Sequence, residues 1–73
     1  MTKHDAMARR IIESAGRAAA AVYCAEFPGA DLGDIGDWDS AAFEIDVRTP
    51  RDGDWEIYRD ALRGEVRRLR TEK

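Results

Sequence analysis

The chain has 73 residues, of which 44% are hydrophobic and 37% charged, and its formal net charge is −3 at pH 7. This length predicts one small domain over residues 1–73, and 13 Leu, Ile, Val and Phe side chains make a core too thin to enclose a catalytic pocket. One cysteine excludes an internal disulfide, and no apolar run approaches the ~20 residues of a membrane span, so we expect a cytoplasmic protein.

The charges are distributed unevenly along the chain. Residues 26–56 carry ten acidic and two basic side chains, a net charge of −8, whereas the segments before and after carry +2 and +3. Four aspartates fall within ADLGDIGDWDS at residues 30–40. This acidic middle between mildly basic ends is the main functional clue in the sequence.

The first predicted element is a helix over residues 4–27, with a capping-box-like start at Thr2 and Asp5. Pro28 and Gly29 end it, because proline cannot continue the hydrogen-bond ladder and glycine suits the reversal. Its apolar stripe consists of Met7, Ile11, Ala15, Ala18 and Val22, widened by Ile12, Ala19, Tyr23 and Phe27. The alanines within residues 15–21 either raise helix propensity or let another helix dock closely.

The middle of the chain predicts a loop and then a strand. Residues 29–40 are rich in glycine and aspartate, and Leu32, Ile35 and Trp38 would anchor them as a loop with a short 3₁₀ turn. Residues 41–48 alternate between apolar and polar side chains, which favours a half-buried strand that ends before Pro50.

The last segment allows two interpretations. Asp54 could cap a helix over residues 54–70, with Trp55, Tyr58, Leu62, Val66 and Leu69 in its stripe, or residues 55–58 could form a return strand before a helix that starts near Arg59. We favour the continuous helix. A solitary strand has unpaired edges, so it requires the return strand or a second subunit, and we expect a weak homodimer.

The predicted fold class is therefore α+β. Two helices pack on a small antiparallel β element in the order α-β-α, or α-β-β-α with the return strand. The expected core consists of Ile11, Val22, Phe43, Ile45, Val47, Leu62 and Val66.

The sequence offers no pattern for metal binding or catalysis. Neither Asp34 nor Asp37 starts a calcium-binding loop with ligands at the required positions, and one cysteine and one distant histidine do not make a zinc site. His4 lies near the N-terminus, and Cys24 has no histidine close in sequence to activate it. We therefore expect no enzyme activity, no metal and no cofactor.

Two surfaces remain as candidates for binding. The acidic segment predicts attraction to a basic protein surface, or simple solubility, and its candidate partner-binding residues are Asp31, Asp34, Asp37, Trp38, Asp39, Glu44 and Asp46. Alternatively, a basic ridge in the last helix could contact nucleic acid, or serve as a solvated helix face; it consists of Arg59, Arg63, Arg67, Arg68 and Arg70.

In general character the chain resembles small phage-encoded anti-CRISPR inhibitor proteins. The resemblance rests on one short acidic domain without a catalytic motif, with ADLGDIGDWDS beside FEIDV, and on no shared motif. It implies binding to a CRISPR effector subunit, whose nucleic-acid site would be blocked by charge mimicry or steric occlusion, with no direct contact to nucleic acid. The alternatives are an antitoxin or small regulator that contacts DNA through the arginine ridge, and an accessory protein that self-assembles through the alanine helix.

Overall fold

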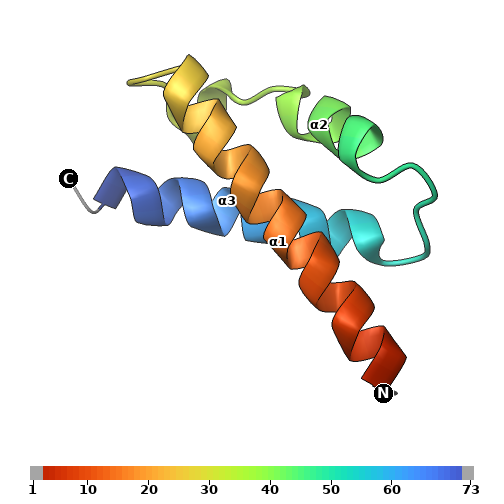
Figure 1. The fold of residues 1–73 in the computed structure, drawn as a ribbon. Coiled ribbons are helices and arrows are strands. Elements are labelled where there is room, and N and C mark those ends of the chain that lie inside the picture. Colours follow the sequence, from red (N-terminus) through yellow and green to blue (C-terminus); the bar gives the residue numbers. More distant parts are fainter. Residues whose placement is uncertain (1–2, 72–73) are drawn as a thin grey trace.

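The computed structural model describes the backbone of residues 3–71 and the side chains of residues 6–71. Along the chain lie α1 (Lys3–Glu26), the 3₁₀ helix η1 (Leu32–Asp34), α2 (Trp38–Asp46) and α3 (Asp54–Thr71). Figure 1 shows α1 crossing in front of α3, with α2 beside this crossing. The cap predicted for Thr2 and Asp5 and the side chain of His4 lie outside the described residues.

The prediction of an α+β fold is wrong, because residues 3–71 form helices and contain no strand. Residues 41–48, predicted as a strand, belong mostly to α2. Their alternation also fits a helix: Asp39 and Phe43 are buried four residues apart, and Ala42 is half-buried beside them. Because a helix satisfies its own backbone hydrogen bonds, the segment needs neither a return strand nor a second subunit.

The core forms where α1 crosses α3. A Cβ added to Gly16 would lie 2.7 Å from the Tyr58 carbonyl oxygen, so α3 approaches α1 at this glycine. The close approach decides which face of α1 is inside. The buried hydrophobic residues are Ile12, Ala19, Ala20, Tyr23, Ile35, Phe43, Tyr58, Leu62 and Val66.

This crossing corrects the predicted core. Phe43, Leu62 and Val66 are buried as expected, and Val47 is half-buried. Ile11, Val22 and Ile45 are exposed instead, because Gly16 turns a neighbouring face of α1 toward α3 and because α2 is a helix rather than a strand. Of the residues that widened the predicted stripe of α1, Ile12, Ala19 and Tyr23 are in the core, whereas Phe27 is exposed.

The last helix and the 3₁₀ turn agree with the structure, whereas the loop predicted over residues 29–40 ends earlier, because α2 begins at Trp38. The helix predicted over residues 54–70 is α3, which runs through residues 55–58, so the return strand is wrong. The predicted 3₁₀ turn is η1, and the anchors Leu32, Ile35 and Trp38 are half-buried or buried. The rings of Trp38 and Tyr23 lie 5.2 Å apart, and those of Phe43 and Tyr58 also 5.2 Å apart, so aromatic contacts hold α2 against α1 and α3.

Candidate protein-binding site

The first two aspartates of the acidic segment cap η1. The Asp31 side chain accepts a hydrogen bond from the Gly33 amide at 2.8 Å, and the Asp34 side chain accepts one from the Asp31 amide at 3.1 Å. This reciprocal arrangement is a capping box, and it satisfies amides at the helix start. The Tyr23 hydroxyl donates to the Asp31 carbonyl oxygen at 3.1 Å, which ties η1 to α1.

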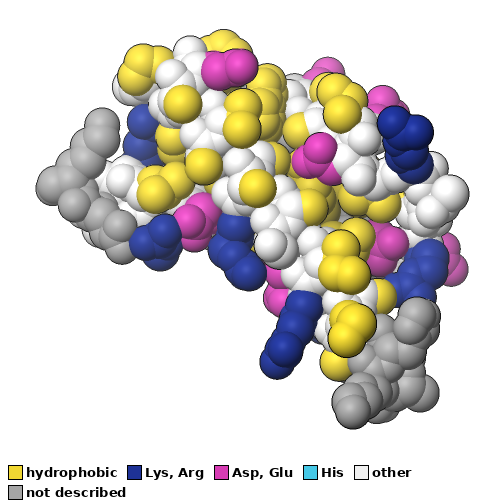
Figure 2. All heavy atoms as spheres, in the orientation of Figure 1, with side chains coloured by type: hydrophobic (Ala, Val, Ile, Leu, Met, Phe, Trp, Pro, Cys, Tyr) yellow, Lys and Arg dark blue, Asp and Glu magenta, His cyan; other side chains and the backbone are white. Residues whose placement is uncertain are grey.

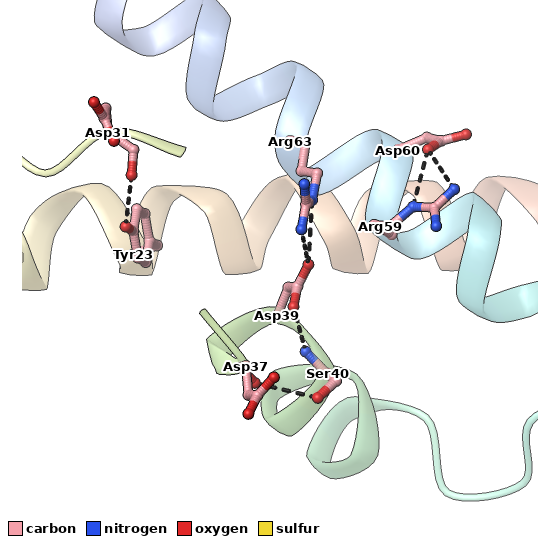
Figure 3. Close-up of polar contacts among 8 residues, drawn as sticks. All are labelled: Tyr23, Asp31, Asp37, Asp39, Ser40, Arg59, Asp60 and Arg63. Carbon is pink, nitrogen blue, oxygen red and sulfur yellow. Dashed lines mark hydrogen bonds and ion pairs between the residues drawn. The ribbon is translucent and has the colours of Figure 1, made fainter. Parts of the chain in front are cut away.

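Asp39 joins α2 to α3 and is removed from the surface. Asp39 is only 3% exposed, and its Oδ2 accepts hydrogen bonds from the Nε of Arg63 at 3.2 Å and from the Nη2 of Arg63 at 3.1 Å. Its Oδ1 accepts from the Ser40 amide at 2.8 Å. Figure 3 shows Asp39 pointing toward Arg63, whereas the Asp37 carboxylate points away. A buried carboxylate requires such partners, so Asp39 has a structural role.

Asp46 forms a second link between these helices. Its Oδ2 accepts a hydrogen bond from the Tyr58 hydroxyl at 2.7 Å. Burial of Tyr58, together with this hydrogen bond, raises the pKa of the phenol above its ordinary value. Burial likewise raises the pKa of Tyr23.

Of the seven residues predicted to bind a partner, Asp39 is buried and Trp38 half-buried, and the others are exposed: Asp31, Asp34, Asp37, Glu44 and Asp46. Asp31, Asp34, Asp39 and Asp46 have the intramolecular partners described above, and Trp38 is half-buried against Tyr23. Asp37 and Glu44 are therefore the two of the seven side chains that are both exposed and without a hydrogen bond or ion pair of their carboxylate among residues 6–71.

The outward side of α2 carries a different group of residues, which we call the α2 face: Asp37, Ala41, Glu44 and Ile45. They recur at helical spacing, and all four are exposed. Ile45 is 76% exposed, more than Met7, Ile11, Val22 or Phe27. Figure 2 shows hydrophobic and acidic side chains close together over α2.

Ile45 was missed as a binding residue because the strand interpretation put it in the core. The available signal was its spacing from Asp37 and Ala41, which places all three on one side of a helix. Using that signal requires knowing that residues 38–46 are helical.

The arginines of α3 are largely engaged within the chain. Arg63 pairs with Asp39, and Arg68 donates to Glu65 at 2.6 and 2.9 Å, which lowers the pKa of that carboxyl. Two further contacts involve Arg59, which pairs with Asp60 at 3.3 Å, and Arg70, whose Nη2 donates to the Phe27 carbonyl oxygen at 3.0 Å. Arg67 is exposed. These contacts reduce the charge that the predicted ridge could offer to phosphates.

The described residues give no other indication of chemistry. Within the described residues no three His, Cys, Asp or Glu residues gather in a group that could hold a metal ion, and Cys24 is a half-buried free thiol. No described helix combines the length and apolar character of a bilayer-crossing segment. Comparisons with protein-family models, curated proteins and solved structures found no match.

Proposed function

We propose that the chain is a non-catalytic protein-binding module that docks on its partner through the α2 face. The exposure of Ile45 carries this proposal. A core this thin would gain from burying a large aliphatic side chain, yet Ile45 stays 76% exposed on a nine-residue helix. A partner that covers this side chain would gain roughly 1.5–3 kcal/mol from its burial.

The charges around Ile45 indicate what kind of surface fits. Glu44 precedes it on the same side of α2, and Asp37 lies at the start of the helix, both exposed and unpaired among residues 6–71. An apolar anchor with an acidic rim suits a basic groove that contains a hydrophobic pocket. The attraction would raise the association rate and weaken with salt, because the Debye length shrinks from ~10 Å at 0.1 M to ~3 Å at 1 M.

As the partner class we propose a CRISPR effector subunit in a bacterial host, following the resemblance to anti-CRISPR inhibitors. Steric occlusion suits the chain better than pure charge mimicry. Several carboxylates of the acidic segment are committed to caps and to α2–α3 contacts, which leaves a smaller charged rim around an apolar centre.

A nucleic-acid partner has weaker support. Of the five arginines of the predicted ridge, Arg63 and Arg68 pair with carboxylates at short distance, and Arg70 donates to a carbonyl oxygen. An antitoxin or small regulator would need these guanidinium groups for phosphates.

The experiment mixes the purified chain with purified effector complexes of several CRISPR types and measures their binding to target DNA by mobility shift. We expect one type of effector complex to lose DNA binding at micromolar concentrations of the chain. The double variant Asp37→Asn, Glu44→Gln keeps side-chain size and should act more weakly, with less dependence on salt. If no effector loses DNA binding, the inhibitor function is wrong. If the chain alone shifts the DNA, the regulator alternative is favoured.

A further inference from the structure

A second surface, apolar except for one serine, runs along the outward side of α1, away from α3. Its residues are spaced by four, three, four, three and four positions, which is the a/d spacing of a coiled-coil interface. All of them are exposed, with Met7 at 61% and Ile11 at 62%. Figure 2 is viewed onto this side and shows hydrophobic side chains along α1. We call these residues the α1 seam: Met7, Ile11, Ser14, Ala18, Ala21 and Ala25.

We propose that a second copy of this chain packs antiparallel on the α1 seam to form a two-fold symmetric dimer. The two-fold axis crosses α1 at the level of Gly16 along the helix. The numbers of any two residues that face each other across the dimer therefore sum to 32. The resulting layers pair Met7 with Ala25 of the partner subunit, Ile11 with Ala21 of the partner subunit, and Ser14 with Ala18 of the partner subunit. Each layer joins an a position to a d position, as an antiparallel coiled coil requires.

The sizes of the seam residues favour this orientation over a parallel one. The large side chains lie at the N-terminal end of the seam, and alanines occupy its C-terminal end. In an antiparallel pair every large side chain meets an alanine, so the helices stay evenly spaced. A parallel pair would put Met7 and Ile11 against their own copies, which forces the helices apart at one end and leaves alanines unpacked at the other.

A hollow in the structure fits the largest of these side chains. Ala21, Cys24, Ala25, Pro28 and Leu69, with Arg70, line a depression of about 360 Å³ at the C-terminal end of α1. In the proposed register, Met7 of the partner subunit lies over Ala25, at the edge of this depression. The unbranched, flexible methionine side chain is well suited to fill an irregular hollow.

The edges and area of the seam predict how the dimer behaves. Ala15 and Val22 flank one edge, whereas Arg10 and Arg17 flank the other, where the two copies of Arg17 would approach each other. From Met7 to Ala25 the seam is roughly 27 Å long and one helix of about 10–12 Å wide, or about 300 Å² per copy. That is below the ~800 Å² per partner of a standard interface, so we expect micromolar or weaker affinity. Because the attraction is apolar and the flanking charges repel, salt should strengthen the dimer.

Sedimentation equilibrium tests the dimer with the full chain between about 5 and 500 µM. We expect the mass to rise from about one chain of 8.2 kDa toward two, and the rise to be larger at 1 M than at 0.1 M salt. Ala18→Glu places two charges beside the axis and should weaken association at least tenfold. Ala6→Glu introduces the same charge at an exposed position of α1 outside the seam, and its dimer affinity should stay within twofold of the parent's. A mass near 8.2 kDa throughout, or equal effects of the two variants, would overturn the proposal.

Disulfide trapping tests the register in a Cys24→Ser background, which leaves no native thiol. Chains carrying Ser14→Cys and chains carrying Ala18→Cys should cross-link when mixed and oxidised, but not singly. In the antiparallel register, each of these positions lies four residues along the axis from its own copy, beyond the Cα separation of ~7 Å that a disulfide spans. Cross-linking of either variant with itself would show a parallel pair and contradict the register. This test is independent of the α2 face, so its failure would leave the proposed function standing.

Discussion

Asp39 of α2 binds the guanidinium of Arg63, which belongs to α3. Replacing Asp39 by Asn removes the negative charge of this contact and keeps the size of the side chain. The Asp39 side chain is 5% exposed, and its carboxylate accepts hydrogen bonds from the Nε and Nη2 of Arg63 at 3.2 and 3.1 Å. Breaking a fully buried ion pair on one side costs about 3–5 kcal/mol. The Arg63 side chain is 37% exposed, so water can hydrate the released guanidinium, and we expect about 2 kcal/mol, within the range for hydrogen bonds to charged groups.

That loss is large for this domain, whose total stability we place at ~3–5 kcal/mol. A thermal melt followed by circular dichroism should show Asp39→Asn melting about 10 °C below the parent, since 1 kcal/mol shifts small domains by roughly 4–8 °C. Asp37→Asn is the matched control, because that exposed carboxylate caps no amide, and it should stay within about 0.5 kcal/mol. In an Arg63→Gln background, Asp39→Asn should cost clearly less than in the parent. Equal melting of the Asp39 and Asp37 variants would refute a structural role for Asp39.

Three further predictions concern stability. Phe43→Ala should cost about 3–5 kcal/mol, which is the whole stability expected of the domain, so this variant should have lost most of its helical circular dichroism before any urea is added. Ile45→Ala should lose less than about 0.5 kcal/mol by urea unfolding; equal loss of structure in the two variants would restore the strand, in which both side chains face the core. Gly16→Ala should lower the melting temperature, because its Cβ would lie 2.7 Å from a backbone oxygen of α3. Gly64→Ala has open space around it and should gain up to about 1 kcal/mol of stability from helix propensity. A gain of stability in both variants would contradict the close crossing. The pKa of Tyr58 is raised in the folded state, so the folded chain keeps a proton that the unfolded chain releases above pH ~10. Stability should therefore fall as pH rises beyond that value, and fall less in Tyr58→Phe. Parallel curves of stability against pH for the parent and Tyr58→Phe would contradict this role of Tyr58.

The parts of the fold that could be predicted from the sequence are those with one unambiguous period. In α3 the apolar residues Tyr58, Leu62 and Val66 repeat at four-residue steps among charged residues, so both its extent and its buried face were predictable. The C-terminal end of α1 was predictable from Pro28, but its buried face was not. Apolar and small side chains cover much of its circumference, and the close contact at Gly16 selects one side only once α3 is in place.

α2 illustrates what local patterns leave undetermined. In nine residues, alternation and helical spacing can coexist, and burial of Phe43 fits both. The deciding contacts are tertiary: Arg63 reaches Asp39 across 24 positions, and Tyr58 reaches Asp46 across 12. The same contacts explain why two aspartates predicted for the binding surface have structural roles.

Some of the candidate site could nevertheless be predicted from the sequence. Asp37 and Glu44 were identified from the acidic composition alone, and both are exposed as a rim residue should be. The anchor was not, because Trp38 is the more conspicuous aromatic candidate but packs on Tyr23. Ile45 became a candidate only through its exposure in the structure.

The most direct test of binding through the α2 face is an affinity measurement on three folded forms of the chain. Each form is titrated against one effector complex that the parent inhibits. The forms are the parent, Ile45→Ser, and Val22→Ser, which removes another exposed aliphatic side chain outside the α2 face. With all three shown to melt alike, we expect Ile45→Ser to bind at least tenfold more weakly, about 1.4 kcal/mol, and Val22→Ser to bind within twofold of the parent. Equal affinity of Ile45→Ser and the parent would contradict docking through this face.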